Sequence, residues 1–484
     1  MERIRIAIDP AIWIPYGPEV RWILRSLFVS LGYPWQLVRP DSDSCDLAYC
    51  CSEASAPRCH ILICADVNRW SRRDEVEFAN AVEVDGLMAF RFSGESEPAG
   101  VAVNHAGEIL VRHDFIFDAF WLASGLAEIG WSKRRFGFFQ MGGSHLYRAG
   151  VFRRAPVSAF GTWLQRQLEP HMGPPPFPRW PRGARCVACA SHDVDYPEVK
   201  RLIEPLRLIA RLGARGFVPA LEVLIGRRNH WHFGSWTAIE KEIGLRSAFY
   251  FVARPGSLVD YALGAPDPFY DVQTPKFRVL LSSLTRDGFE VGLQASYFAY
   301  QSLAKFLSEK RIIEEVAQSP IYGNRHHYWH LNPVDPEETL IIHEQAGLLY
   351  DTSLGFEHCA GWRRGIVWPF FPYSHRLRRP VRTLQIQTVW MDDQLFGHAD
   401  YNRPDASSVL NALVETMIEQ GGVFLADMHE YVFDRVLFPN WSDTYVGLFR
   451  SLSSRGDIYL DRPVNVARHW IYREARISNI SEGL

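Results

Sequence analysis

The chain has 484 residues, of which 47% are hydrophobic and 22% charged, with a formal net charge of -3 at pH 7. This length favours two or three domains over one, and the composition is that of a globular protein with a substantial core. The small net charge gives no reason to expect a nucleic acid as partner, and no apolar run approaches the roughly 20 residues of a membrane-spanning helix.

The first hundred residues read as a small α/β domain. Residues 1–14, MERIRIAIDPAIWI, lack the basic and long apolar regions of a signal peptide, so we expect a cytoplasmic protein. Residues 3–15 predict a strand, and residues 19–33 have helical spacing that ends on Gly32. Apolar runs at 46–50, 60–65 and 86–91 predict further strands between polar turns. We therefore assign an accessory domain to residues 1–115.

A connector follows at residues 116–183. It begins with an apolar stretch, HDFIFDAFWLASGLAEIGW, whose periodicity predicts a core helix over 113–131. It ends in MGPPPFPRWPRG, residues 172–183, which holds five prolines and two glycines in twelve residues. Proline continues neither a helix nor a central strand, so this segment predicts a stiff, extended linker.

From residue 184 to 475, strand and helix signals alternate, with a short tail expected at 476–484. Alternation of this kind predicts an α/β domain with a mostly parallel sheet or barrel, in which chemistry collects at the carboxyl ends of the strands. The first candidate is ARCVACASHDVDYPEV, a buried-strand pattern that runs into a charged turn, and the later ones are 247–252, 288–293, 320–324, 348–350, 383–390, 423–427 and 457–460.

Eight cysteines are present, and two of them, Cys186 and Cys189, form a CxxC. A zinc site needs four ligands at regular spacing, which the scattered remainder does not supply. Buried free thiols are the favoured interpretation.

The sequence His192-Asp193-Val194-Asp195 carries the first candidate chemistry. Two carboxylates that are two residues apart at a strand end point to the same side, where a cation or a shared proton would relieve their repulsion. One could bind a metal while the other takes a proton from water. The alternative is an Asp-rich turn that caps the following helix.

Eight segments follow one another in a recognisable order: PRWPRGARCVACASHDVD, LRSAFYFV, DPFYDV, GFEVGLQASY, GNRHHYW, EQAGLLYDTSLGF, GWRRGIVWPF and FLADMHEYVFD. In this order they resemble the polysaccharide deacetylase (NodB-homology, carbohydrate esterase) superfamily, in its bacterial branch with an N-terminal accessory domain. The resemblance covers about residues 175–475. It implies a distorted (β/α) barrel, preceded by the smaller α/β domain, that hydrolyses an N- or O-acetyl group on a sugar of a surface polysaccharide or its precursor.

The resemblance also implies roles for individual residues. Asp193 matches the general base, Asp195 a metal ligand, and Arg325 the arginine that orients the base. His429 matches the general acid, and Asp392 or Asp393 could orient it. We expect the sugar to be contacted by His327, Gln294, Trp368 and Asp392, with Trp362 as a further aromatic candidate.

Each of these residues has a structural alternative. Arg325 could pair with a structural carboxylate, and His429 could be a satisfied histidine at a strand end. His326, His327 and His330 could cover an aromatic face. The two aspartates after Trp390 could be turn residues, and both tryptophans could belong to the core.

One departure concerns the metal. The family binds zinc with one Asp and two His, but those histidine positions hold Gln294 and Phe298 here. An amide oxygen is a poor zinc ligand beside imidazole, and a phenyl ring is none. Metal binding could be restored if His192, His327 or His429 turned toward the metal. It could also be restored if a cation that prefers oxygen ligands bound to Asp193, Asp195 and Gln294.

Two functions follow. The first is a metal-dependent carbohydrate deacetylase with an altered site, with a divalent metal, zinc first, as cofactor and an acetylated sugar or polysaccharide as partner. The second is an inactive homologue without a cofactor, which binds a glycan or a protein through the old cleft.

Overall fold

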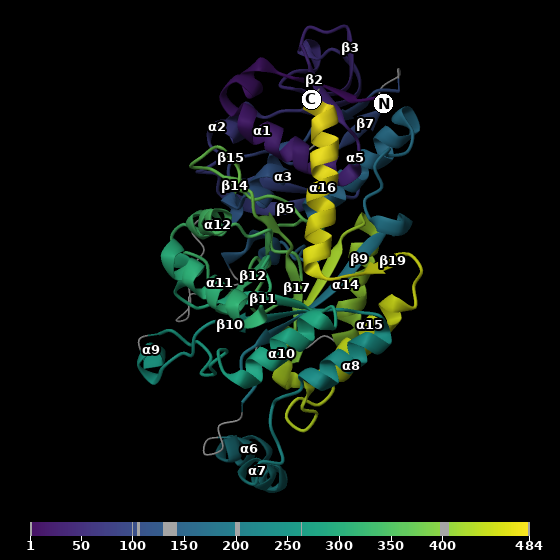
Figure 1. Cartoon of the computed structure of the whole chain (residues 1–484). Coiled ribbons are helices and arrows are strands. Elements are labelled where there is room, and N and C mark those ends of the chain that lie inside the picture. The colour runs from purple at the N-terminus through teal and green to yellow at the C-terminus, as the bar shows by residue number, and fades with distance from the viewer. Residues whose placement is uncertain are drawn as a thin grey trace.

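A computed structural model describes residues 2–98, 100–103, 107–128, 143–198, 204–262, 264–396 and 406–482. An N-terminal unit with its own sheet lies at the top of Figure 1, and a larger unit built around a second sheet lies below it. Helices lie between the two sheets, so the hydrophobic core is continuous from one unit to the other.

The N-terminal sheet has six strands in the order β2-β1-β3-β4-β8-β7, all parallel except β7. A separate antiparallel hairpin, β5-β6, lies beside it. The strands are β1 (Ile4–Ile8), β2 (Trp35–Val38), β3 (Ser44–Cys50), β4 (Arg58–Cys64), β5 (Phe78–Val84), β6 (Leu87–Phe92), β7 (Val101–Val103) and β8 (Ile109–Val111).

The strand predicted over 3–15 is too long. Asp9 accepts a hydrogen bond from the Ala11 amide, and Pro10 follows at the first helical position, where its missing N–H costs nothing. Helix α1 (Pro10–Leu31) therefore starts immediately after β1 and ends on Gly32 in the left-handed region, φ 89°.

The connector is helical, and it packs against the first unit. Of the helix predicted over 113–131, α3 (Phe115–Ser124) forms, while residues 129–131 lie outside the described residues. The other helices of the connector are α4 (His145–Arg148) and α5 (Pro156–Met172), while α2 (Val67–Ser71) belongs to the first unit.

The second sheet confirms the predicted parallel α/β arrangement. Its order is β16-β13-β12-β11-β10-β9-β18-β17, with β19 beside β9, and every pairing is parallel. The strands are β9 (Cys186–Val194), β10 (Ala248–Val252), β11 (Glu290–Ala295), β12 (Gly323–His326), β13 (Tyr350–Asp351), β16 (Leu384–Gln385), β17 (Thr388–Met391), β18 (Val423–Asp427) and β19 (Ile458–Leu460).

The sheet curls into a distorted barrel. Its two edge strands, β16 and β17, are neighbours in the chain and are separated only by Ile386 and Gln387. A chain advances at most about 3.6 Å per residue, so the two edges of the sheet lie close together. The fold class predicted from the sequence, a (β/α) barrel behind a smaller α/β domain, is confirmed at this level.

Helices surround the barrel on its outside, and a small antiparallel pair, β14 (Tyr373–Ser374) with β15 (Arg379–Pro380), extends toward the first unit. The helices are α8 (Phe233–Ile243), α9 (Leu258–Ala262), α10 (Pro275–Arg286), α11 (Leu303–Ala317), α12 (Pro336–Gln345), α13 (Asp392–Phe396), α14 (Ala406–Gln420) and α15 (Trp441–Ser453). Two more, α6 (Glu204–Leu212) and α7 (Phe217–Leu224), form a hairpin that stands clear of the barrel (Figure 1).

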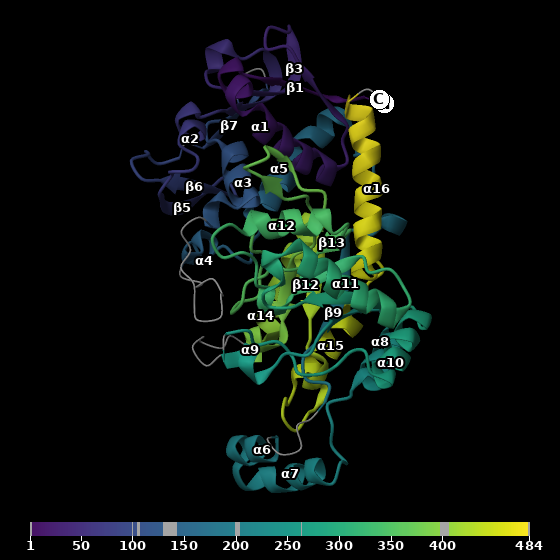
Figure 2. The ribbon, with the colours of Figure 1, turned by 60° about the vertical axis from the view of Figure 1, so that its left-hand side comes forward.

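The C-terminal residues form no tail, in contrast to the expectation for 476–484. Helix α16 (Pro463–Glu482) leaves the barrel and runs up along the N-terminal unit, and both chain ends lie at the same end of the molecule (Figure 2). There Ser481 accepts a hydrogen bond from the Trp35 amide, and Arg25 pairs with Glu474 at 2.8 Å.

The proline-rich segment is extended but also packed. Trp180 is 1% exposed and donates to the Gly421 carbonyl, while Arg179 donates to the carbonyls of Ser30 and Gln420. Six of the eight cysteines, including Cys186 and Cys189, are buried. No helix in the described part of the chain is both long and apolar enough to cross a membrane.

Candidate active site

The carboxyl ends of five barrel strands bring the candidate residues to one edge of the sheet, because parallel strands all end on the same side. Strand β9 supplies Asp193 and, just beyond its end, Asp195. The other positions follow from β11, β12, β17 and β18 and hold Gln294, Arg325, His327, Asp392, Asp427 and His429.

Arg325 is the fixed centre of the site. It is fully buried, and its Nη1 atom lies 2.8 Å from Asp193 Oδ1 and 2.6 Å from Asp427 Oδ1. Its Nε and Nη2 atoms donate to hydroxyl groups of Thr352, Ser191 and Thr388. One guanidinium therefore serves two carboxylates, and every edge of its planar fork is used.

Asp193 is the group with the pKa suited to a base at neutral pH. Burial raises the pKa of this carboxyl, Arg325 opposes the rise, and the neighbouring Asp427 adds to it, so that the pKa reaches about 7. A carboxylate with this pKa exchanges a proton near neutrality, as a general base must.

Asp195 is enclosed by polar groups on both oxygens. Gln294 Nε2 donates to Asp195 Oδ1 at 3.0 Å, while Nε2 of His429 and of His327 lie 3.4 and 3.6 Å from Oδ2. Burial by itself would raise the pKa of Asp195, but the two imidazoles outweigh it and hold that pKa below its ordinary value. Asp195 is therefore a carboxylate that stabilises positive charge on its neighbours.

Each of the two imidazoles is held from behind by a second carboxylate. His327 Nδ1 lies 3.0 Å from Asp267, and His429 Nδ1 lies 3.0 Å from Asp392 Oδ2, which also accepts from the His429 amide at 2.7 Å. Burial lowers the pKa of His327, but Asp195 and then Asp267 raise it to about 9. Burial also lowers the pKa of His429, but Tyr431, Asp392 and Asp195 raise it well above its usual value. The carboxylates around both rings therefore favour their protonated forms.

The backbone beside the histidines is strained. Tyr328 and Trp329, directly after His327, both have positive φ angles of 57° and 47°. Such conformations cost roughly 1–3 kcal/mol each for residues with large side chains and persist where the surroundings impose them, often at functional sites. Burial and the nearby Asp195 carboxylate raise the pKa of Tyr328 and of Tyr196 above the usual value.

The residues do not fit the zinc site that the family resemblance implies. Gln294 turns its amide N–H, rather than its oxygen, toward Asp195, and Gln294 Oε1 is buried without a hydrogen-bond partner. Phe298 packs with Tyr297. Within the described residues, no group of three or more His, Cys, Asp or Glu side chains is arranged to hold a metal ion.

His192 does not replace a missing metal ligand, because its side chain points to the other side of β9. Its ring bonds the Met428 carbonyl and Glu240 and is fully buried.

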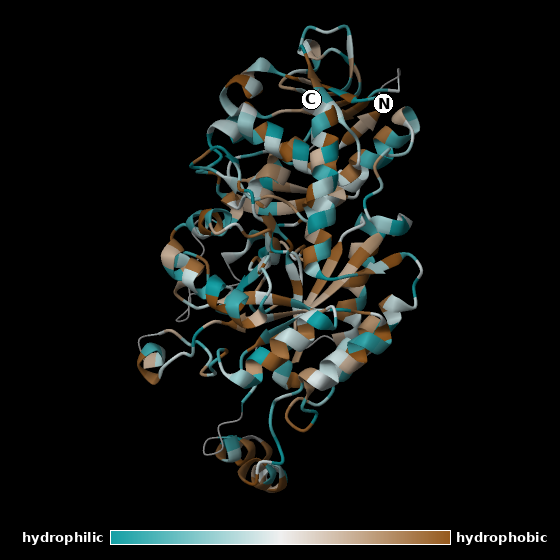
Figure 3. Cartoon of the chain, viewed as in Figure 1, coloured by the Kyte–Doolittle hydropathy of each residue, from teal (hydrophilic) through white to brown (hydrophobic). Residues whose placement is uncertain are grey.

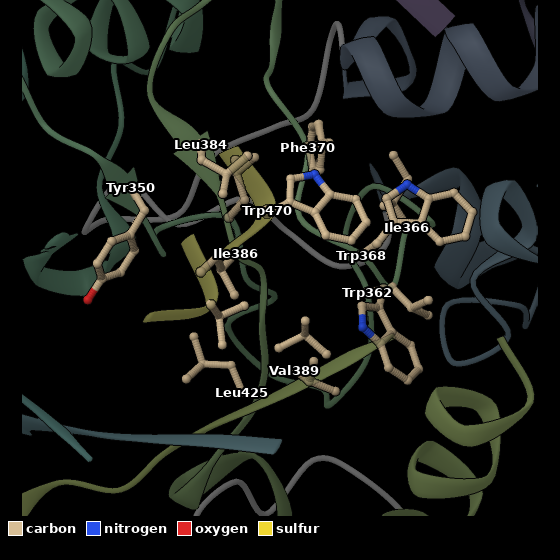
Figure 4. Packing of buried hydrophobic residues seen from close by; sticks show 14 of the residues in the cluster. Tyr350, Trp362, Ile366, Trp368, Phe370, Leu384, Ile386, Val389, Leu425 and Trp470 are labelled. Atoms are coloured by element: carbon tan, nitrogen blue, oxygen red, sulfur yellow. The ribbon is translucent and has the colours of Figure 1, made fainter. Parts of the chain in front are cut away.

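Four residues expected to contact sugar make contacts within the protein. Gln294 is fully buried against Asp195, and Asp392 is 1% exposed and holds His429. Trp368 and Trp362 lie in the hydrophobic cluster of Figure 4, where Trp368 contacts Gly161 of α5. The tryptophans thus lie in the core, the alternative given for them, whereas Asp392 lies where it can orient His429, as the resemblance implies. Gln294 and His327 both lie beside Asp195.

Asp427 and Asp267 belong to the site but are absent from the sequence-based set. Asp427 closes the apolar strand VFLAD, and a single polar residue that ends such a run at the carboxyl edge is the signal that could have found it. Asp267 opens the segment DPFYDV, one of the eight that carry the resemblance, and its place in that segment is the signal that could have found it.

Comparisons with known proteins give similarities in fold. No protein-family model and no curated protein matches this chain. Two candidate polysaccharide deacetylases of known structure are similar to it. One, from Mycobacterium smegmatis, has 14% identity and a TM-score of 0.41, and covers 61% of this chain and 93% of its own. The other, from Pseudomonas aeruginosa PAO1, has 15% identity and a TM-score of 0.40, and covers 63% and 97%.

A third similar structure, Puue allantoinase, has 15% identity and a TM-score of 0.41, and covers 62% of this chain and 96% of its own. All three extend over roughly the length of the barrel unit.

Proposed function

We propose that the protein is a hydrolase of the deacetylase class, which removes an N- or O-acetyl group from a sugar of a surface polysaccharide or its precursor. One observation supports this most strongly: the buried carboxyl of Asp193, which Arg325 binds at 2.8 Å and whose pKa is raised to about 7, shares a cluster with His429, which Asp392 binds at 3.0 Å and whose pKa is raised well above its usual value. Acyl hydrolysis needs one group that accepts a proton and another that donates one, and such pairs have environments that shift their pKa values differently.

In the proposed reaction a water molecule attacks the carbonyl carbon of the acetyl group while Asp193 takes the proton that the water loses. The bond from that carbon to the sugar nitrogen or oxygen then breaks, and His429 gives its proton to the leaving atom. The products are acetate and the deacetylated sugar. Asp392 positions His429 through the bonds to Nδ1 and to the backbone amide.

We further propose that no resident metal takes part. Asp195 Oδ1 is bound by the Gln294 amide and Oδ2 faces two protonated imidazoles, so the positive charge near the reacting carbonyl comes from His327 and His429. Preorganised charge of this kind stabilises a developing oxyanion in a site that excludes water.

The central test is acetate release from N- and O-acetylated sugars by the wild type, Asp193→Asn and His429→Gln. Removing a general base or acid should lower kcat by about 10²- to 10⁴-fold. Asp443→Asn, a substitution of an exposed aspartate, serves as the matched control and should keep full activity. Unchanged turnover in either site variant would remove the proposal.

The metal proposal has its own measurement. Elemental analysis of the purified protein should find far less than one metal per chain, and dialysis against EDTA should leave acetate release unchanged. Activity that disappears on dialysis and returns with zinc or cobalt would contradict it.

A non-catalytic role is the second candidate, and Gln294 is the observation that favours it. Its amide closes one face of Asp195, where the family places a metal. If the wild type releases no acetate from any acetylated sugar but binds one of them in calorimetry, and Asp193→Asn weakens that binding, the binding role replaces the hydrolase.

A further inference from the structure

The helical hairpin α6–α7 has an unusual position for a segment of a folded domain. Figures 1 and 2 both show it standing away from the barrel at the end opposite the chain termini. Its small core joins Leu208, Ala220 and Val223 to Leu437 of the barrel unit, and Arg228 at its base pairs with Asp434. The hairpin is therefore anchored at its base and faces solvent over the rest of its surface.

The solvent-facing side of the hairpin is apolar. Phe217, Val218 and Leu221 are 62%, 68% and 58% exposed, and Leu206, Leu224 and Ile225 are also exposed. Large apolar residues gather on this hairpin in Figure 3. Of the twenty exposed large hydrophobic side chains in the described residues, ten lie between Tyr196 and Tyr261. A contiguous exposed apolar surface of this kind marks an interaction site.

Basic residues flank this apolar side. Between residues 204 and 228 the sequence has five arginines, at 207, 211, 215, 227 and 228, against two glutamates, at 204 and 222. Arg207, Arg215 and Arg227 are exposed, whereas Glu222 is paired with Arg228. The surface therefore combines apolar side chains with a net positive charge.

A second apolar projection lies on the same edge of the barrel. Helix α9 follows β10 as the hairpin follows β9, and its Leu258, Val259 and Tyr261 are more than half exposed. Since β9 and β10 are parallel, both projections leave from the carboxyl edge that holds Asp193 and Asp195.

We propose that the α6–α7 hairpin, with α9, binds the surface of an anionic lipid bilayer. Apolar side chains that enter the interface beside arginines that meet anionic headgroups are the features of an interfacial amphipathic segment. The projections are convex, which suits insertion between lipids better than burial in a protein pocket. If the proposed deacetylase function holds, the sugar is then carried by a membrane lipid and reaches the carboxyl edge from the bilayer.

Vesicle flotation tests the proposal with the full chain. The wild type should float with vesicles of phosphatidylcholine mixed with phosphatidylglycerol, and much less with phosphatidylcholine alone or at high salt. Phe217→Ser/Leu221→Ser/Leu224→Ser should lower the partition coefficient by at least about tenfold. Arg215→Gln/Arg227→Gln should lower it by roughly fivefold per arginine.

The matched control is Ile14→Ser/Val334→Ser, which removes apolar side chains that are 80% and 92% exposed elsewhere and should float as the wild type does. Because all substituted residues are exposed, the thermal midpoint should not change in any variant. A wild type that stays unbound, or a triple variant that floats fully, overturns the proposal. So does a dimer in light scattering that the triple variant abolishes, which would identify a second copy as the occupant.

Flotation needs no catalysis, so Asp193→Asn should bind vesicles normally. Failure of flotation therefore leaves the proposed hydrolysis untouched, and failure of acetate release leaves the membrane proposal untouched. If the protein both binds membranes and hydrolyses acetyl groups, Phe217→Ser/Leu221→Ser/Leu224→Ser should lose activity on an acetylated glycolipid in vesicles. The same variant should keep its activity on a soluble acetylated sugar.

Discussion

Asp193 and Asp427 share a single guanidinium, and this sharing sets the chemistry of the base. Both carboxylates accept from Arg325 Nη1, within 2.8 Å. Burial is the main cause that raises the pKa of Asp193, Arg325 lowers it, and repulsion from the Asp427 carboxylate adds to the rise, so that the pKa lies at about 7. Asp427 is thus a positioning residue that acts through Arg325 and through its charge.

Asp427→Asn should move the pH dependence of the reaction. Since the base works in its ionised form, kcat/KM should rise with pH through about 7 in the wild type. Without the neighbouring charge, the pKa of Asp193 falls and the rising limb shifts to lower pH. A pH profile of acetate release checks this, with Asp443→Asn as a surface control.

The same pKa shift has a consequence for stability. A carboxyl whose pKa is higher in the folded than in the unfolded state stabilises the fold at low pH, and this contribution is lost as pH rises through about 7. Asp427→Asn should reduce the loss. A rising limb that stays in place in the variant, with unchanged stability, would show that Asp427 does not act on Asp193.

For single residues, the sequence predicts which side chains carry the chemistry better than it predicts which atoms they contact. The sequence predicts that Asp193, Arg325 and His429 come together. Apolar runs locate the ends of their strands, and parallel strands end on the same edge of a sheet. The environment of Gln294 cannot be predicted in this way, since it depends on which end of an amide faces Asp195 in three dimensions. Trp368 misleads for a related reason: an aromatic residue after a loop is compatible with both a sugar site and a core.

Among the helices, the contact of α5 with the barrel unit is notably close. Gly161 of α5 lies so near Trp368 that an added Cβ would be 2.8 Å from the ring. Trp368 in turn has Arg179 of the proline-rich segment 5.7 Å from its ring centre. The interface therefore requires the smallest residue at this point of a helix.

Gly161→Ala should destabilise the protein by about 1–3 kcal/mol, because the tryptophan ring must move within a packed core. The control is Gly447→Ala in α15, an exposed helical glycine with open space around it. Alanine there should stabilise by up to about 1 kcal/mol through helix propensity alone. Urea unfolding of both variants checks this, and equal effects would contradict the packing argument.

The sequence predicts the buried strands of the barrel better than it predicts the start of α1 or the closure of the barrel. Buried parallel strands produce continuous apolar runs, so every strand predicted from 247 onward exists. The start of α1 was missed because its first turns are as apolar as a strand. The closure of the barrel could not be predicted, since β16 has only two residues and pairs with β13 rather than with its sequence neighbour β17.

The whole molecule is joined by buried charge as well as by apolar packing. Glu128 of the connector binds Arg363 at 2.9 Å and Arg364 at 2.9 Å. All three side chains are nearly inaccessible to solvent. Burial alone would raise the pKa of Glu128, but the two arginines outweigh it and keep that pKa below its usual value. The carboxylate therefore balances two buried cations.

Glu128→Gln should cost about 3–5 kcal/mol of unfolding free energy, because it leaves two buried guanidinium groups without a counter-charge. Glu242→Gln removes the carboxylate of an exposed pair with Arg450 and should change stability by less than about 0.5 kcal/mol. Thermal unfolding of the two variants provides the comparison. A small loss for Glu128→Gln would indicate that water reaches these arginines.

Helix α16 also sets an order of events during synthesis. A ribosome releases the chain from its N-terminus, yet Trp35 and Arg25 bond to Ser481 and Glu474 of α16. While the barrel is being translated, the flank of the first unit stays open to chaperones and to other nascent chains. The first unit can gain these contacts only after α16 has left the ribosome, so a chain truncated before α16 would lack contacts at its beginning as well.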